Sequence, residues 1–179
     1  ITEQIKSIAD IDFAVFDPEC GERMREAVMA ARADGDSVGG VLETAVTGMP
    51  AGVGEPWFDT VEGLLSHALF SIPAVKGVEF GDGFALADMR GSQSNDPLRA
   101  ESGRVTAQSN HCGGIGGGIT MGSPMIFRCA VKPTPSISRE QQTVDLDTGE
   151  NATLTIRGRH DPAIVHRART VVDSMTAIT

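Results

Sequence analysis

A glycine-rich stretch, an apolar run and a basic turn bracketed by prolines form the part of the chain best suited to chemistry. Residues 109–136 read SNHCGGIGGGITMGSPMIFRCAVKPTPS, with five glycines within 113–118. Glycine lets backbone come very close to a flat or bulky group, because no Cβ intervenes. The apolar run at 124–131 predicts a strand. At its end stand a cation and two hydroxyls around two ring-locked prolines: Lys132, Pro133, Thr134, Pro135 and Ser136.

Two interpretations of this stretch stay open on the residues alone. A surface of glycine backbone, a cation and a rigid turn that carries hydroxyls suit an anionic ligand such as a phosphate or a flavin. Alternatively, the glycines form a hairpin that only solves a packing problem. Spacing alone favours the packing interpretation, because neither phosphate-loop pattern is present. There is no GxxxxGK[ST], and GxGxxG would need glycine where Ile119 stands.

A second constellation is basic and lies at the junction of a predicted strand and the last helix. Between 157 and 169 the cationic and imidazole side chains are Arg157, Arg159, His160, His166, Arg167 and Arg169, and only Asp161 is acidic. Arginine suits the planar, bidentate grip of carboxylate or phosphate. Asp161 stands just before Pro162 and is also a natural helix N-cap. For Arg159 and Asp161 a ligand role and a structural role have equal weight.

The elements that must position these residues follow a mixed α/β order within one domain, 1–179. Charge and hydrophobic periodicity predict helices at 17–33, at 57–69 and from 162, and strands at 41–47, 76–81, 124–131, 143–146 and 153–157. The first residues, 1–15, indicate a turn of helix leading to a strand. The polar segment 87–106 has the length and composition of a structureless lid or subunit-contact loop.

Composition bounds the class of protein. A net charge of −9 argues against nucleic acid or an anionic membrane as the main partner. The three cysteines have no metal-like spacing and are a poor disulfide framework, so we expect no metal site and a reducing cytoplasm. No apolar run has the length of a transmembrane helix, and no signal-peptide pattern opens the chain. The chain begins ITEQIKSI without an initiator Met, which indicates a fragment or a processed chain.

Several long motifs, taken together, resemble the carboxyl-terminal half of chorismate synthase. Besides 109–137 they are DSVGGVLE, PAGVGEPWFD, SIPAVKGVEFGDGF, GSQSNDPL and GRHDPAIVHRARTVVDSM. The resemblance covers about 17–175 in the family's order. Three positions depart from the family's usual residues: Asp173 stands for Glu, Met121 for Asn and Pro73 for Asn.

The resemblance implies a β-α-β sandwich fold, a homotetramer and the chemistry of aromatic amino acid biosynthesis. Chorismate synthase eliminates phosphate from 5-enolpyruvylshikimate 3-phosphate in a 1,4-anti reaction that needs reduced FMN. By resemblance, the flavin contacts Pro73, Ala74, Gly117, the residues Lys132, Pro133, Thr134, Pro135 and Ser136, and Arg159. Arg159 would also contact an anionic group of the substrate, and Asp161 would lie near flavin N5 and accept its proton.

Residues that the family carries in its amino-terminal half are missing from this sequence: two active-site histidines, several substrate-gripping arginines and a Ser-Ala-Arg flavin segment. His111 belongs to the glycine-rich motif and does not replace these histidines; we expect it either to be structural or to act indirectly, behind the residues that contact the ligand. The hypothesis is therefore a fragment that is inactive alone. The alternatives are a non-catalytic assembly domain of the same fold and, less favoured, an unrelated nucleotide-binding domain. Whether NADPH or an external reductase reduces the flavin is left open.

Overall fold

A three-stranded antiparallel sheet organises the chain. The structure is a computed structural model that describes residues 2–9, 11 and 13–179. The sheet has the order β1-β7-β2, with β1 at Gly40–Val46, β7 at Met125–Val131 and β2 at Val75–Phe80. Gly40 pairs with Val131 and Val46 with Met125, so β1 and β7 run antiparallel over their full lengths. The predicted strands at 41–47, 76–81 and 124–131 are confirmed.

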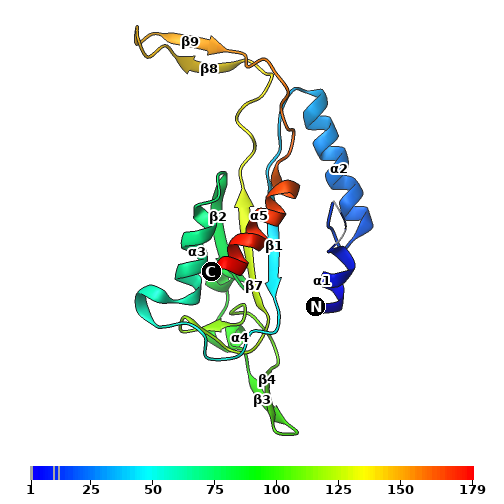
Figure 1. The fold of residues 1–179 in the computed structure, drawn as a ribbon, viewed down its shortest axis with the longest axis vertical. Coiled ribbons are helices and arrows are strands. Elements are labelled where there is room, and N and C mark those ends of the chain that lie inside the picture. The colour runs from blue at the N-terminus through cyan, green and yellow to red at the C-terminus, as the bar shows by residue number, and fades with distance from the viewer. Residues whose placement is uncertain (1, 10, 12) are drawn as a thin grey trace.

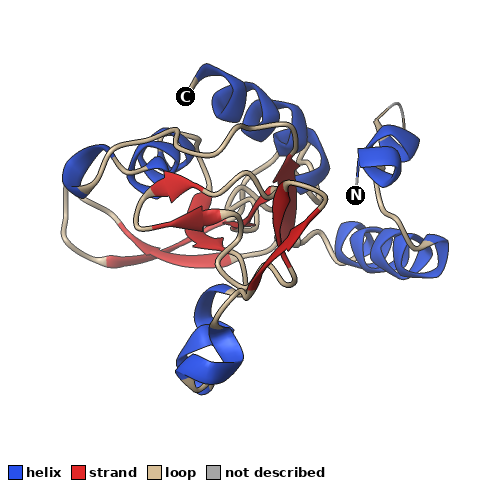
Figure 2. Cartoon of the chain, turned by 90° about the horizontal axis from the view of Figure 1, so that it is seen from below, coloured by secondary structure: helices blue, strands red, loops and turns tan. Residues whose placement is uncertain are grey.

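Two helices cover one face of this sheet, as Figures 1 and 2 show: α3, Val61–Phe70, and α5, Val165–Ile178. Alternate side chains of β7 point into this layer because successive residues of a strand face opposite sides. They meet Leu65 and Leu69 of α3 and Val172 of α5, and together these residues form the core. Phe127 and Leu69 have no exposed surface.

Helix periodicity places the helices correctly but some of their faces wrongly. Trp57 lies outside α3, on the short 3-10 turn η1, Trp57–Asp59, and is 85% exposed. Val171 of α5 is 47% exposed although it belongs to the apolar stripe of this helix. The last helix begins at Val165 rather than Pro162. These errors arise because a helical stripe shows which residues share a face, but not how wide the covered part of that face is.

The amino-terminal arm consists of α1, Thr2–Ile8, and α2, Pro18–Ala33, with the described residues between them. The predicted start of α2 is confirmed: the Asp17 carboxylate accepts a hydrogen bond from the Glu19 amide at 2.9 Å, and Pro18 occupies the first turn. The arm lies beside β1 (Figure 1). It buries little: α1 has no buried residue, and α2 buries only Gly21. Met24, on the apolar face of α2, is 49% exposed.

The segment 87–106 is not structureless. It contains the end of the 3-10 helix η2, Gly83–Asp88, the short α4, Gly91–Ser94, and most of a hairpin, β3, Leu98–Glu101, with β4, Arg104–Ala107. The hairpin turns at Ser102-Gly103, which both have positive φ, as a two-residue turn of the type favoured in hairpins requires. The serine concealed this turn from a search for Asn-Gly or Asp-Gly.

Two further hairpins complete the chain. One joins β5, Ile115–Gly116, to β6, Ile119–Thr120, within the glycine-rich stretch. The other joins β8, Gln141–Val144, to β9, Asn151–Leu154, near the predicted short strands. In Figure 1 the β8–β9 and β3–β4 hairpins project from opposite ends of the sheet. None of the helices described between residues 2 and 179 is long and apolar enough to cross a membrane.

Candidate functional site

The predicted ligand residues gather where β7 ends and β2 begins. The Lys132 amide donates a hydrogen bond to the Ala74 carbonyl at 2.9 Å, so the turn after β7 lies against the residue that precedes β2. Ala74 has a φ of +75°, a conformation that a residue with a Cβ adopts only when its surroundings hold it there. Pro73 fixes the chain on one side of Ala74, and strand pairing fixes it on the other.

The Lys132–Ser136 turn is held from the other side by the strand that enters the sheet. The Ser37 hydroxyl donates to the Thr134 carbonyl at 2.6 Å. Gly39 permits this approach, because a Cβ there would lie 2.4 Å from the Val131 carbonyl oxygen. Ser37 carries no prediction from the sequence. The only available signal was its position in the DSVGG motif.

One hydroxyl of the turn has no partner. Thr134 Oγ1 is buried and makes no hydrogen bond with any described residue. A buried polar group without a partner is costly, typically about 1–3 kcal/mol. Its neighbour Ser136 is satisfied, since its hydroxyl lies 3.1 Å from His160 Nδ1. The turn thus holds one unpaired hydroxyl, two residues along the chain from Lys132.

His160 joins the turn to the basic residues at 157–169, which follow β9 and continue into α5 and which we call the basic junction. Its Nδ1 meets Ser136, and its Nε2 lies 3.1 Å from the Ile156 carbonyl oxygen. The junction is tied to the sheet as well, because the Val38 amide donates to the Pro162 carbonyl at 2.8 Å. These contacts bring Arg159 and Asp161 to the same end of the sheet as Lys132. Sequence reasoning counted His160 within the basic cluster but gave it no role in orienting the turn.

Asp161 is not the N-cap of the last helix, so that alternative is wrong. Helix α5 is preceded by Ile164, which makes no side-chain cap. The Asp161 carboxylate instead accepts a hydrogen bond from the Arg167 guanidinium at 2.6 Å, one turn into the helix. Arg159 is exposed, and within the described chain its guanidinium makes no hydrogen bond or ion pair. It is therefore free to meet an anion.

A further ion pair, between Asp36 and Arg139, lies beside the turn. Asp36 lies 3.0 Å from Arg139, just past the turn. The Ser37 amide and the Arg139 guanidinium lower the pKa of Asp36, so this carboxylate stays ionised and neutralises Arg139. Lys132 and Arg159 remain as the cations without a partner among the candidate residues that the structure describes.

Gly117 lies elsewhere. It stands at the tip of the β5–β6 hairpin, next to the residue whose carbonyl accepts the Val61 amide at 3.0 Å, beside the start of α3. Lys132 follows the opposite end of β7, and six residue steps along a strand span about 20 Å. Nothing lies within 4 Å of a Cβ built on Gly117. The structure therefore joins Pro73, Ala74, the turn and the basic junction, but does not bring Gly117 beside them.

His111 is occupied by a structural contact. Its Nδ1 lies 2.5 Å from the Asp82 carboxylate, and its carbonyl accepts the Asp82 amide at 2.9 Å. The hydrogen bond to Asp82 raises the pKa of His111, which favours the imidazolium. Both residues sit among the glycines at the amino-terminal end of β7, away from Lys132. This arrangement agrees with the structural role expected for His111.

Comparisons with known proteins match the whole chain. A family model described as chorismate synthase matches residues 1–179. A chorismate synthase of Methanosarcina acetivorans is 56% identical over 98% of this chain and 48% of the relative, and one of Korarchaeum cryptofilum is 54% identical over 88% and 44%. A crystal structure of chorismate synthase superposes with a TM-score of 0.77 at 30% identity, covering 97% of this chain and 45% of that one. The chain thus spans about half the length of its relatives, and it belongs to the chorismate synthase family.

Proposed function

We propose that this chain is the carboxyl-terminal part of a chorismate synthase and supplies one wall of its FMN site. The observation that carries this proposal is the turn after β7, which packs against Ala74 through the Lys132 amide and holds the buried, unpaired hydroxyl of Thr134. Lys132 and Arg159 form no ion pair with any described residue, and these groups together suit an anionic, hydrogen-bonding ligand. The site residues are those predicted from the sequence: Pro73, Ala74, Lys132, Pro133, Thr134, Pro135, Ser136, Arg159 and Asp161, with Gly117 as a more distant member.

Each group has a definite task in the elimination of phosphate from 5-enolpyruvylshikimate 3-phosphate. Lys132 and Arg159 hold anionic groups of cofactor and substrate. Thr134 donates or accepts a hydrogen bond, while Ser136 and His160 keep the turn in place. Asp161, whose carboxylate accepts a hydrogen bond from the Arg167 guanidinium, would accept the proton at flavin N5. Reduced FMN supplies the electron density that lets phosphate leave; the residues of this chain supply position and charge.

The same proposal covers the assembly and setting of the enzyme. We propose that the 179 residues form one domain. The complete enzyme is a homotetramer of the cytoplasm that uses reduced FMN. This chain alone does not turn over substrate, because the other half of the family's chain carries further groups of the active site. Family membership and the half-length match support this division.

Titration with reduced FMN, followed by calorimetry under anaerobic conditions, tests the site. We expect one FMN per chain, and a loss of affinity of about tenfold or more in Lys132→Ala, since a charge-assisted contact is worth about 1.5–3 kcal/mol. Lys6→Ala is the matched control, because it removes the same charge from α1, where Lys6 pairs with Glu3 and with no other residue that the structure describes. No binding, or equal losses in both variants, supports the non-catalytic assembly domain instead. Chorismate formation by the chain alone would refute the division of the active site.

A further inference from the structure

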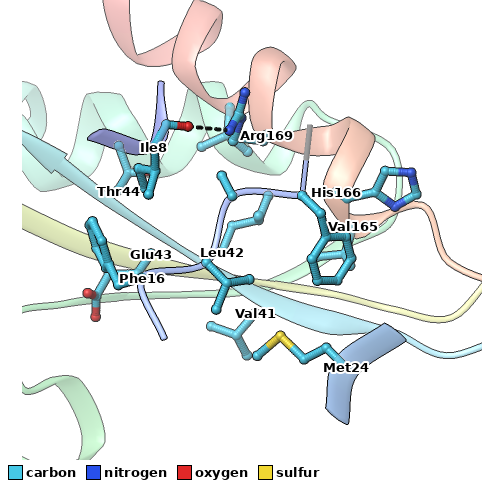
Figure 3. A pocket seen from close by; sticks show the side chains of 14 residues that line it. Ile8, Phe16, Met24, Val41, Leu42, Glu43, Thr44, Val165, His166 and Arg169 are labelled. Carbon is cyan, nitrogen blue, oxygen red and sulfur yellow. Dashed lines mark hydrogen bonds between the residues drawn. The ribbon is translucent and has the colours of Figure 1, made fainter. Parts of the chain in front are cut away.

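The basic junction contains two histidines in different surroundings. His166, on the first turn of α5, is exposed and lines a cavity of about 270 Å³ between β1, α5 and the amino-terminal arm (Figure 3). Its ring lies beside that of Phe13, with 6.3 Å between the ring centroids. His160 is half-buried, and both of its ring nitrogens lie within hydrogen-bond distance of a polar group. The fold therefore fixes the ring of His160, while His166 stands at the surface.

The polar neighbours of His160 decide where its proton lies. Nε2 is 3.1 Å from the Ile156 carbonyl oxygen, which can only accept a hydrogen bond, so Nε2 carries a hydrogen. A neutral imidazole has one donor and one acceptor, and Nδ1 is then the acceptor. The Ser136 hydroxyl, 3.1 Å from Nδ1, therefore donates to the ring. The hydrogen of this hydroxyl is used within the protein.

The chain around His160 is shaped for the contact with Ile156. Gly158 lies between the two residues and has a φ of +148°, in a region that residues with a Cβ rarely adopt, so the chain can turn back on itself. Just beyond His160 the chain is tied to the sheet, because the Val38 amide donates to the Pro162 carbonyl at 2.8 Å. With the backbone held on both sides, the ring cannot readily turn over and exchange its two nitrogens.

The two hydroxyls of the turn after β7 thus differ in what they offer a ligand. Thr134 Oγ1 has no partner among the described residues and is free to donate or to accept. Ser136 has its hydrogen committed to His160 and offers a ligand only the lone pairs of its oxygen. A fully ionised phosphate or carboxylate oxygen also only accepts, so it cannot bond to Ser136 in this state. A hydroxyl or an N–H group can.

We propose that His160 is a positioning residue, which holds the Ser136 hydroxyl with its hydrogen towards the ring, so that Ser136 accepts a hydrogen bond from a hydroxyl or N–H group of FMN. Ionised groups of the ligands are then left to Lys132, Arg159 and Thr134. This inference rests on the proposed function, because it concerns the same turn. It divides the work within that site: the cations meet charge, and Ser136 meets a neutral donor.

The position of the proton can be measured without any ligand. In the ¹⁵N-labelled chain at about pH 8, a long-range proton–nitrogen spectrum distinguishes a protonated ring nitrogen from a bare one. We expect His160 to give the signals of a neutral ring with its proton on Nε2, assigned by their loss in His160→Gln. The His166 signals, assigned likewise in His166→Gln, are the reference for a ring at the surface. A proton on Nδ1 of His160, alone or together with one on Nε2, would overturn the proposal.

Two substitutions separate the two nitrogens of His160 in the anaerobic titration with reduced FMN. In His160→Asn the amide oxygen takes the place of Nδ1 as an acceptor for Ser136. In His160→Gln the amide nitrogen keeps the donor to Ile156 but leaves Ser136 without its acceptor. We expect His160→Asn to stay within about twofold of the parent in FMN affinity, whereas His160→Gln and Ser136→Ala should each lower it about threefold to tenfold. His166→Gln is the matched control and should leave the affinity unchanged.

A ring that only fills space would behave differently. Equal losses of FMN affinity in His160→Asn and His160→Gln, or a loss in neither, would refute the positioning role, and so would an equal loss in His166→Gln. If the parent chain binds no FMN although the spectrum shows the expected ring, the proposed function fails and the orientation of Ser136 stands. If the parent binds FMN but Nδ1 of His160 is protonated, this inference fails alone.

Discussion

The two ends of β7 treat their polar groups in opposite ways. At the amino-terminal end, glycines and hydrogen-bonded side chains close the structure on itself. Asp96 alone accepts hydrogen bonds from the Ser109 hydroxyl at 2.6 Å, the His111 amide at 2.8 Å and the Cys112 amide at 3.0 Å. At the carboxyl-terminal end, the Thr134 hydroxyl is buried without a described partner, and the Lys132 ammonium forms no ion pair with any described residue. The first end is built for packing and the second for a ligand.

This difference divides the stretch 109–136, which reads as one motif in the sequence, into two parts. The glycines at 113 and 114 bring backbone against backbone: a Cβ on Gly113 would lie 2.4 Å from the Gly81 amide nitrogen, and one on Gly114 would lie 2.4 Å from the Pro124 carbonyl oxygen. The packing interpretation therefore holds for these glycines. The ligand interpretation is carried by the residues after β7. Gly117, with open space around it, is the position where the two interpretations still compete.

The largest expected effect is on the packed end. In Gly81→Ala the new methyl group would lie 2.1 Å from the His111 carbonyl oxygen, and the residue would keep a φ of +57°. Because backbone atoms cannot move aside cheaply, we expect a loss of at least about 3 kcal/mol in the free energy of unfolding. Urea denaturation followed by circular dichroism measures it.

Gly117→Ala is the matched control for that change. It has a similar φ of +61° but no neighbour within 4 Å, so it should cost only about 1 kcal/mol for the backbone conformation. Equal losses in the two variants would show that conformation rather than contact decides the cost. If Gly117→Ala weakens FMN binding while stability falls this little, Gly117 belongs to the ligand site after all.

A smaller effect is expected for the carboxylate that ties the packed end together. Asp96→Asn keeps the shape but removes the charge that three donors meet, and we expect a loss of about 1–2 kcal/mol at pH 7. Partial burial acts to raise the pKa of Asp96, but hydrogen bonds from Ser109, Cys112 and His111 outweigh it and lower the pKa below 3.8.

The sign of the pH dependence follows from that shift. A lowered pKa in the folded state contributes stability above about pH 4, which is lost as pH falls through the folded value. The difference in unfolding free energy between the parent and Asp96→Asn should therefore shrink as pH drops below 3.8. A difference that stays constant down to pH 2 would mean that Asp96 acts through its shape alone.

How far the sequence predicts this molecule depends on the range of the interaction. Local chemistry was readable: the Asp17 cap and the start of α2 follow from three adjacent residues. The contacts that build the site are long-range. Lys132 meets Ala74, and Ser37 meets Thr134, only because of the register of three strands. No periodicity encodes that register, and so sequence reasoning proposed Thr134 but could not find Ser37.

The same limit explains the wrong expectation for Asp161. Its place before Pro162 is typical of a cap, and the local pattern contains nothing against it. The helix instead begins three residues later, because the Pro162 carbonyl is engaged by the Val38 amide and Ala163 is buried beside the sheet. Tertiary contacts fix where the helix starts, and they leave the carboxylate free to pair with Arg167.

The smallest expected effect on stability should separate the two ends of β7 most sharply. Thr134→Val replaces the unpartnered hydroxyl by a methyl group of nearly the same shape. Removing a buried polar group that has no partner costs nothing in the unliganded protein, so the free energy of unfolding should stay within about 0.5 kcal/mol of the parent or rise slightly. FMN affinity should nevertheless fall about fivefold to tenfold, as expected for one lost hydrogen bond.

Thr120→Val is the matched control at the packed end, because Thr120 Oγ1 donates to the Pro50 carbonyl at 2.7 Å and accepts from the Val53 amide at 2.9 Å. It should lower stability by about 1–3 kcal/mol and leave FMN affinity unchanged. If instead Thr134→Val lowered stability as much as Thr120→Val without changing FMN affinity, the carboxyl-terminal end of β7 would be a packing device as well, and the contrast between the two ends would disappear.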